Sequence, residues 1–363
     1  MSVPDVSADP PAAAPPAQCS LETYTTLRLG GPADRLAIAH NSDDVLSAIR
    51  AAALAGQPVL VLAGGSNVVI GDAGFPGTVV LIRTRGVHVT PIGADAVTVR
   101  VEAGEPWDAL VGTAVANGWS GIECLAGIPG STGATPIQNV GAYGQEVAET
   151  IGSVRVYDRA DDRVVTMTPQ QCRFGYRSSV FKHNDRWVVL SVDFRLARSP
   201  LSAPVRYAEL ARALGVEVGA RVPLEQASSA VRRLRAGKGM VLDGADHDTW
   251  SVGSFFTNPV LDAPAYRALC ARVADLDAPP SWPTADGLVK VSAAWLIDRA
   301  GFAKGYGGAG GVSISGKHTL ALTNRGTGST AALIALAREI RDGVQDRFGV
   351  RLHPEPVLVN CEL

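Results

Sequence analysis

The sequence has few cysteines, and they form no pattern typical of a disulfide framework or a zinc site. Its 5 cysteines are odd in number, widely scattered and without a C-x-x-C pair. Structural zinc sites and disulfide-stapled domains both rely on closely spaced or paired cysteines. We therefore expect no bound metal, and we expect the protein to work in a reducing cytoplasm.

The sequence also lacks basic clusters and long apolar runs. The formal net charge is -2, and no lysine-arginine cluster of nucleic-acid type is present, so nucleic acid is not an expected partner. No charge-free apolar run approaches the roughly 20 residues of a membrane-spanning helix, which predicts no membrane insertion. Residues 1–18 are rich in Pro and Ala, lack the basic start and apolar centre of a secretory signal, and are predicted to be a disordered tail.

Two nucleotide-binding signatures are missing as well. No G-x-G-x-x-G segment follows a predicted strand and opens a helix, as a Rossmann-type nicotinamide site requires. Residues 311–318 approach the spacing of a P-loop, but the hydroxyl residue Thr319 comes one position late. Residues 319–324 then read as a strand, whereas a P-loop continues into a helix. The sequence therefore argues against nucleotide hydrolysis.

The residues that are present indicate a mixed α/β protein of two or three domains. Of the 363 residues, 46% are hydrophobic and 19% charged, enough to bury a large core. Ser42 is the predicted N-cap of a helix over residues 43–55, and Gly56 ends it. Further helices are predicted at 106–115, 224–236, 292–300 and 329–348, the last with an apolar stripe facing a sheet. Strands are predicted at 59–62, 97–101, 251–257, 311–315 and 319–322, and at 154–157, 164–167 and 187–196 in one sheet.

Two glycine-rich segments are the strongest functional signal. Gly64-Gly65-Ser66-Asn67 follows the predicted strand at 59–62, and residues 126–144 read AGIPGSTGATPIQNVGAYG. Glycines allow backbone N–H groups to approach a ligand closely and to form anion-binding concavities. Either segment alone has an ordinary reading, because glycine turns are common and most bind nothing. Together they predict a pyrophosphate held from two sides.

These segments resemble the flavin-binding loops of the UDP-N-acetylenolpyruvoylglucosamine reductase family, which completes UDP-N-acetylmuramate for peptidoglycan. The resemblance covers nearly the whole chain after the tail, with further matching blocks at 23–31, 173–177, 253–259 and 293–298. It implies an α+β, mixed α/β fold with a two-part FAD-binding region of the vanillyl-alcohol-oxidase/PCMH type and a C-terminal α/β substrate-binding domain. On this basis we expect a first FAD-binding subdomain over 19–85, with 354–363 returning to it, a second over 86–220, and the substrate-binding domain over 221–353.

The activity that the resemblance implies is FAD-dependent, NADPH-driven reduction of the enolpyruvyl group of UDP-N-acetylenolpyruvoylglucosamine. The family's catalytic residues match Arg177, Ser254 and Glu355. The Arg177 guanidinium would bind the substrate carboxylate and the enediolate, and the Ser254 hydroxyl would supply a proton. Glu355 would donate a hydrogen bond only while protonated, so burial would have to raise its pKa. No His-Asp pattern marks Ser254 as a nucleophile.

The resemblance also assigns ligand contacts. Lys238 and Asn258 match substrate-binding positions, and Tyr207 looks like the mobile tyrosine of the subclass with an insertion at 205–210. His318 stands where some relatives have Gln, so it is either a substrate contact or an exposed loop histidine. Thr257 departs from the family pattern, because some members have Lys at this position. The expected pyrophosphate donors are Gly64, Gly65, Ser66 and Asn67, and the expected contacts of the rest of the flavin are Gly127, Gly130, Gly133, Gln138, Asn139 and Gly141.

Two alternative functions stay open from the sequence. An FAD-dependent sugar or alcohol oxidase of the same superfamily would consume oxygen with a simple sugar. A non-catalytic UDP-sugar sensor would tolerate alanine at Ser254. Cell-wall synthesis enzymes are candidate partners for the tail at 1–18.

Overall fold

Three hydrophobic cores organise residues 19–284 and 286–363, which this computed structural model describes. The largest lies against the antiparallel sheet, the second lies among the C-terminal helices, and a small third one lies under the parallel sheet. The predicted mixed α/β architecture is confirmed. The tail predicted at 1–18 lies outside the described residues. No helix in the described part of the chain is long and apolar enough to cross a membrane.

The first portion is a small sheet in the order β1-β2-β5-β3, in which β2, β5 and β3 are parallel and α1 packs on them. The predicted strand at 59–62 is confirmed. The predicted helix cap is one residue late, because the Asn41 side chain, not Ser42, accepts the Asp44 N–H at 2.9 Å. The elements are β1 (Cys19–Ser20), β2 (Pro32–Ala39), α1 (Ser42–Leu54), β3 (Val59–Leu62), β4 (Val68–Ile70) and β5 (Phe75–Ile82).

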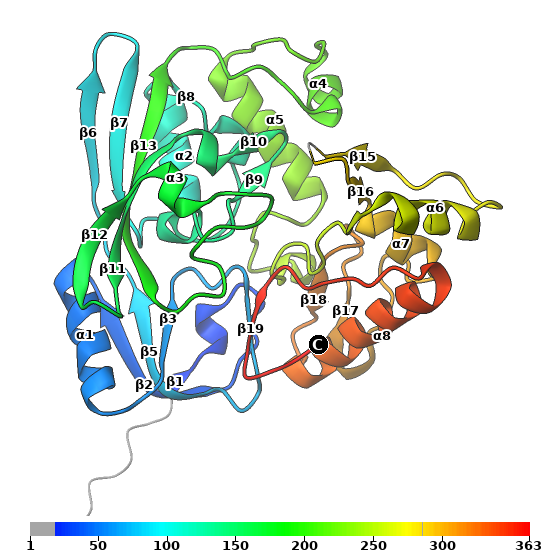
Figure 1. Cartoon of the computed structure of the whole chain (residues 1–363), viewed down its shortest axis with the longest axis horizontal. Helices are drawn as coiled ribbons and strands as arrows, with labels where there is room; N and C mark the ends of the chain where they lie inside the picture. Colours follow the sequence, from blue (N-terminus) through cyan, green and yellow to red (C-terminus); the bar gives the residue numbers. More distant parts are fainter. Residues whose placement is uncertain (1–18, 285) are drawn as a thin grey trace, which may run out of the picture.

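The second portion is an antiparallel sheet in the order β12-β11-β13-β7-β6, with β8 also paired to β13 (Figure 1). The strands predicted at 97–101, 154–157, 164–167 and 187–196 are confirmed, and the last three share this sheet. Its strands are β6 (Val87–Ile92), β7 (Ala96–Glu102), β8 (Trp119–Ser120), β11 (Ile151–Asp158), β12 (Arg163–Met167) and β13 (Trp187–Arg198). Beside them lie α2 (Trp107–Ala116), the β9–β10 pair (Gly141–Ala142 and Gln145–Glu146), α3 (Pro169–Cys172), α4 (Ala208–Leu214) and α5 (Leu224–Gly237).

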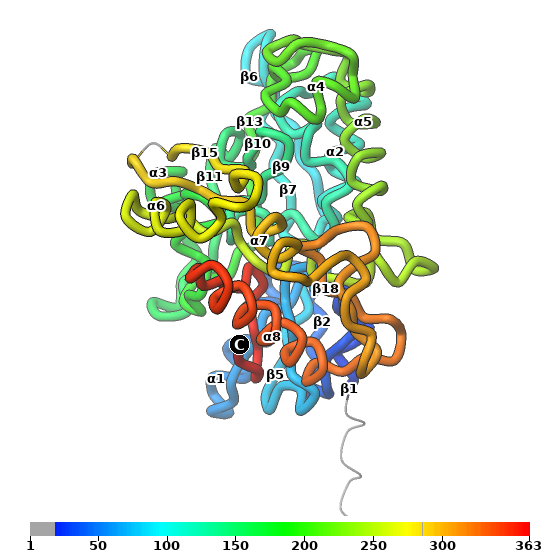
Figure 2. Tube along the Cα trace, turned by 90° about the vertical axis from the view of Figure 1, so that its right-hand side faces the viewer, coloured from blue at the N-terminus to red at the C-terminus, as the bar shows by residue number. Residues whose placement is uncertain are grey.

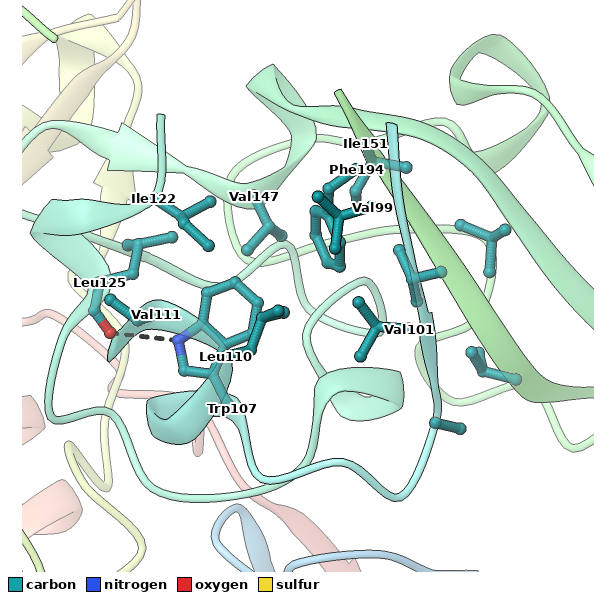
Figure 3. Close-up of a cluster of buried hydrophobic side chains, with 14 of the residues drawn as sticks. Val99, Val101, Trp107, Leu110, Val111, Ile122, Leu125, Val147, Ile151 and Phe194 are labelled. Atoms are coloured by element: carbon teal, nitrogen blue, oxygen red, sulfur yellow. Dashed lines mark hydrogen bonds between the residues drawn. The ribbon is translucent and has the colours of Figure 1, made fainter. Parts of the chain in front are cut away.

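Trp107 anchors the core of this second portion (Figure 3). It is fully buried, its ring centroid lies 5.7 Å from that of Phe194, and inward-facing residues of β7 surround it. Its indole Nε1 donates to the carbonyl of Leu125 at 3.1 Å. Because Leu125 directly precedes residues 126–144, this buried bond fixes where the second glycine segment begins.

The C-terminal portion packs α8 (Thr330–Phe348) onto the hairpin of β17 (Val312–Ile314) and β18 (Leu322–Asn324). The predicted helices at 224–236, 292–300 and 329–348 and the strand at 311–315 are confirmed. A turn follows β17, where a P-loop would continue into a helix, so residues 311–318 are not a P-loop. The other elements are β14 (Val260–Leu261), α6 (Ala263–Arg272), β15 (Ser281–Pro283), β16 (Val289–Val291) and α7 (Ala293–Arg299).

Two strand predictions in this portion are wrong. The strand predicted at 319–322 starts only at Leu322. Residues 251–257 form isolated bridges instead of a strand, because Gly253 adopts a left-handed φ of 75° and turns the chain. The residues after this turn bond to neighbouring loops, as Phe255 N–H does to the Leu320 carbonyl at 2.7 Å.

The chain end returns to the first portion. Strand β19 (Val357–Val359) pairs in parallel with β4, and the Val357 N–H donates to the Asn67 carbonyl at 3.0 Å. Figures 1 and 2 both show this red segment beside the blue and cyan strands. The first glycine turn, which contains Asn67, is therefore tied directly to the segment that carries Glu355.

Candidate functional site

Arg177 lies in the loop after α3, in the left-handed conformation with φ 50°. Its Nη2 donates to the Gly141 carbonyl at 2.7 Å and its Nη1 to the Asn139 carbonyl at 3.4 Å. Its Nε lies 3.2 Å from Glu355 Oε1. A Cβ on Gly141 would lie 3.1 Å from Arg177 Nη1 and 2.9 Å from the Gln145 carbonyl, so a larger residue would crowd the guanidinium. The second glycine segment therefore orients this arginine.

Glu355 is held beside the segment that carries Ser254. The Glu355 N–H donates to the carbonyl of Phe255, the residue after Ser254, at 2.8 Å. Its carboxyl is largely buried, and burial raises its pKa, while the charges of Arg177 and Lys182 oppose that rise. One backbone hydrogen bond and one ion pair thus bring the three predicted catalytic residues to one place.

Ser254 sits at the turn made by Gly253, in front of two buried rings. Phe255 and Phe256 are at most 1% exposed and pack edge to face with centroids 5.1 Å apart. Phe256 forms a bridge with Pro354, which precedes Glu355. The serine is half-buried and directly precedes these two buried residues in the chain.

Two further residues near Arg177 escaped the sequence analysis. Lys182 Nζ donates to the Arg177 carbonyl at 3.2 Å, and burial lowers the pKa of Lys182. The Tyr176 ring lies 5.5 Å from the Arg177 guanidinium and 4.7 Å from Lys290 Nζ. The only signal for Lys182 in the sequence is its closeness to Arg177 along the chain.

The two glycine segments touch each other. A Cβ on Gly64 would lie 2.6 Å from the Gly130 Cα, and a Cβ on Gly130 would lie 2.5 Å from Ser66 Oγ. The Asn67 amide also donates to Gln138 Oε1 at 2.8 Å. These close approaches require glycine at both positions and join the two predicted cradles into one.

The first glycine turn keeps its amide hydrogens free. Within the described parts of the chain, the N–H groups of residues 64–67 donate to no protein acceptor. Arg83 lies beside them, with Nη1 on the Ala63 carbonyl at 2.9 Å. Arg83 was not predicted from the sequence. It directly follows strand β5, just as the glycine turn follows strand β3. Neighbouring parallel strands bring such loops to one edge, where anions bind.

Arg235 adds a second unused donor. Its Nη2 bonds to the Met240 carbonyl at 2.9 Å, but its buried Nε has no partner among the described residues. Burial lowers the pKa of Arg235 to about 10. A Cβ on Gly127 would lie 3.7 Å from this Nε, which places the group against the second glycine segment. A buried guanidinium N–H without a partner is suited to an anionic acceptor.

A cavity of about 530 Å³ opens beside the first glycine turn. Gly64, Arg83 and Trp250 line it, and the buried Trp250 Nε1 is likewise without a partner among the described residues. The free amides of the first glycine turn, the Arg83 guanidinium and the unpaired Trp250 indole donor meet at this cavity, and together they fit a phosphate-bearing cofactor such as FAD.

Other predicted flavin contacts are already bonded within the protein. The Gly127 N–H donates to Asp108 Oδ1 at 2.7 Å, and the Gly133 N–H donates to the Ala103 carbonyl at 2.9 Å. The side chain of Asn139 is buried: its amide donates to Glu146 Oε2 and to the Gly175 carbonyl, and its oxygen accepts the Ala148 N–H. Any contact of these residues with a ligand must therefore come from their remaining atoms.

Three of the predicted substrate contacts gather at the end of α5. Lys238 Nζ lies 2.7 Å from Glu209 Oε2 and 5.7 Å from the Tyr143 ring. Tyr143 and Tyr207 pack edge to face at 5.7 Å. Burial, with the charges of Lys238 and its neighbours, lowers the pKa of His318 to about 4, so this histidine is neutral. Glu209 and Tyr143 were not singled out by the sequence analysis.

Asn258, the fourth predicted substrate contact, lies between the start of α7 and Tyr176. Its Oδ1 accepts the N–H of Ala293 at the start of α7 at 3.0 Å. Its amide approaches the Tyr176 hydroxyl, and burial raises the pKa of that tyrosine. Asn258 therefore links the start of α7 to the Arg177 loop.

Comparisons with known proteins agree along the whole described chain. Residues 245–359 match the family model described as UDP-N-acetylenolpyruvoylglucosamine reductase, C-terminal domain, and residues 33–168 match the FAD binding domain. The UDP-N-acetylenolpyruvoylglucosamine reductase of Salinispora arenicola is 69% identical over 351 residues, 96% of this chain and 97% of the relative. That of Streptomyces coelicolor is 56% identical over 349 residues, 94% of this chain and 90% of the relative.

A solved structure shows the same fold. The UDP-N-acetylenolpyruvylglucosamine reductase of Thermus caldophilus matches with a TM-score of 0.65 at 24% identity, covering 94% of this chain and 98% of that one. Together with the matched FAD binding domain, it confirms the predicted fold class, a two-part FAD-binding region followed by a C-terminal α/β domain.

Proposed function

The chain belongs to the UDP-N-acetylenolpyruvoylglucosamine reductase family, and from this premise we propose that Arg177, Ser254 and Glu355 carry the family's reaction in it. The reaction is the FAD-dependent reduction of UDP-N-acetylenolpyruvoylglucosamine to UDP-N-acetylmuramate in peptidoglycan precursor synthesis. The observation that carries the proposal is the 3.2 Å contact of Arg177 Nε with Glu355 Oε1, an oxygen that accepts from the guanidinium whether the carboxyl is protonated or not. The backbone bond from Glu355 holds this contact against the Ser254 segment.

FAD would be held by the amides of residues 64–67 and by Arg83. When bound and reduced by NADPH, FAD supplies the electron pair that reduces the enolpyruvyl double bond. The unpaired Nε of Arg235 is suited to a phosphate of either the cofactor or the substrate. The other predicted flavin contacts would also line the cofactor. The backbone N–H groups of Gly127 and Gly133 would take no part, because they already donate to Asp108 and to the Ala103 carbonyl.

Reduction places negative charge on the carbon next to the substrate carboxylate, and that charge spreads into an enediolate. Arg177 is prepared for this charge, because two carbonyls and Glu355 fix its guanidinium before substrate arrives. Fixed donors stabilise developing charge without reorganisation. Ser254 supplies the proton in front of the Phe255 and Phe256 wall, which limits competing water.

The pH dependence of Glu355 tests its role as a donor. A carboxyl donates only while protonated, and burial raises the pKa of Glu355 above its ordinary value. The rate should therefore be full below that raised pKa and fall as the pH rises through it. Glu355→Gln keeps an N–H donor but removes the titration, so it should work within about tenfold of the natural enzyme and lose this alkaline fall.

The measurement is kcat/KM against pH for both proteins, with bound FAD recorded in each. An unchanged alkaline fall in the Glu355→Gln protein would assign that fall to another group. Glu362→Gln, near the chain end, is the matched control, because its carboxyl is outside the site and its removal should leave the profile as it was.

The contact between the glycine segments predicts a strong effect of Gly64→Ala. The new Cβ would lie 2.6 Å from the Gly130 Cα, which has no room to yield. Overpacking of this kind costs about 1–3 kcal/mol, so FAD should bind roughly tenfold or more weakly. Titrating FAD into the flavin-free protein by fluorescence quenching checks this. Gly112→Ala on α2 meets no atom within 4 Å and should bind FAD normally.

The proposed reaction is tested without oxygen. The bound flavin is reduced with NADPH, UDP-N-acetylenolpyruvoylglucosamine is added, and the visible absorbance of the flavin is followed. Return of the oxidised spectrum with formation of UDP-N-acetylmuramate supports the proposal. A flavin that stays reduced until air enters would reject this substrate and favour an oxidase.

A cytoplasmic location and a role of the tail in binding cell-wall enzymes stay predictions.

A further inference from the structure

The ammonium group of Lys238 is held by the carboxylate of Glu209, which has no part in the function proposed above. Lys238 Nζ and Glu209 Oε2 lie 2.7 Å apart, and the two side chains are 37% and 30% exposed. Lys238 directly follows α5, and Glu209 is in the first turn of α4, two residues after Tyr207. The pair thus joins the insertion to a residue predicted to bind the substrate, and the ammonium group of that residue is suited to the substrate diphosphate.

The surroundings of this pair favour anions. Arg235 and Lys304 act on the neighbouring His318 together with Lys238, and their charges help to lower its pKa. Burial raises the pKa of Tyr143 to about 12, and the Glu209 charge adds to this rise, so the phenol stays neutral. Glu209 is therefore a negative charge set among cations.

We propose that Glu209 is a displaceable internal anion, which occupies Lys238 and competes with the diphosphate of the substrate for it. A carboxylate and a phosphate bind an ammonium group through the same charge-assisted hydrogen bonds. Both cannot approach Lys238 at such distances without strong repulsion between them. The diphosphate must therefore displace Glu209, whereas a ligand with a weaker anion leaves the pair closed. This inference rests on the proposed substrate role of Lys238.

The displacement needs only a side-chain rotation. Leu210 and Ala211 are buried and fix α4, while Arg206 ties the preceding residues to Glu149 at 2.8 Å. Glu209 is partly exposed on this fixed helix, so its flexible side chain can turn to solvent while the backbone stays. The exposed ring of Tyr207 lies on the same side, against Tyr143.

The test measures UDP binding to the FAD-loaded enzyme by isothermal titration calorimetry. Glu209→Gln keeps the size of the side chain but removes its charge, and UDP should then bind about 1.5- to 5-fold more tightly, the range of a partly exposed ion pair. Glu225→Gln removes an exposed carboxylate from the first turn of α5 and should leave UDP binding unchanged. FAD content and melting temperature confirm that each variant is folded.

Lys238→Met distinguishes a failure of the proposed competition by Glu209 from a failure of the proposed substrate role of Lys238. It should weaken UDP binding, and adding Glu209→Gln to it should give a smaller gain than in the natural enzyme. If Lys238→Met weakens binding but Glu209→Gln leaves it unchanged or weakens it, Glu209 positions Lys238 and the competition is rejected. If Lys238→Met leaves UDP binding unchanged, the proposed substrate role of Lys238 falls, and the competition falls with it.

Discussion

Ser254→Ala should bind FAD and substrate normally but reduce the substrate about 10²- to 10⁴-fold more slowly, the usual contribution of a positioned proton donor. The substitution removes one oxygen atom and leaves the left-handed turn at Gly253 and the buried Phe255 unchanged. No other part of the chain should move. Reduction of the flavin by NADPH does not use this proton and should keep its rate.

Anaerobic stopped-flow measurements separate the two steps. The first mixes the oxidised enzyme with NADPH, and the second mixes the reduced enzyme with UDP-N-acetylenolpyruvoylglucosamine. Thr257→Val is the matched control, because it removes a hydroxyl three residues away that makes only a 3.4 Å bond to the His353 carbonyl. A Ser254→Ala protein that also loses FAD or slows the NADPH step would show that the hydroxyl supports the fold instead.

The regular elements could be predicted because their signal is local. Strand β7 of the antiparallel sheet alternates buried residues with more exposed ones, and α8 keeps an apolar stripe through Leu333, Ile340 and Phe348. Asn41 and Ser42 are both good caps, so the choice between them depends on a single hydrogen bond that the sequence does not display.

Residues 251–257 show where local signals fail. Their aromatic and hydroxyl residues favour a strand, but the turn at Gly253 and bonds from distant residues decide their conformation. The Phe255 N–H bonds to Leu320, and its carbonyl accepts the Glu355 N–H. These partners lie far away in the sequence, and they also place Ser254 in the site.

The site itself was only partly predictable. Arg177, Ser254 and Glu355 were found by their motifs, and the structure adds the bonds that join them. Arg235 carries no motif, because a lone charge on a predicted helix looks like an ordinary solvated residue. Glu209 lies in the insertion at 205–210, of which only Tyr207 was predicted to contact the substrate. Their importance appears only when the fold leaves Arg235 Nε without a partner among the described residues and places Glu209 on Lys238.

Arg177→Lys should lower kcat/KM about 10²- to 10³-fold, the usual loss when one fixed donor to a developing oxyanion is removed. Lysine keeps the positive charge but cannot bond at once to the Gly141 carbonyl, the Asn139 carbonyl and Glu355. Its ammonium group would therefore be less well oriented when charge develops. Arg173→Lys is the matched control, because Arg173 is in the same loop with the same φ of 50° but is exposed.

Arg177→Ala extends this prediction to Glu355. Without the guanidinium, the charge of Lys182 is left to oppose the effect of burial on the carboxyl. The pKa of Glu355 should therefore rise further. The alkaline fall in rate should then move to higher pH while the maximum rate drops. Guanidinium ions added to this variant should restore part of the rate and return the fall toward its natural position. A variant that guanidinium does not rescue, with FAD still bound, would contradict a local electrostatic role for Arg177.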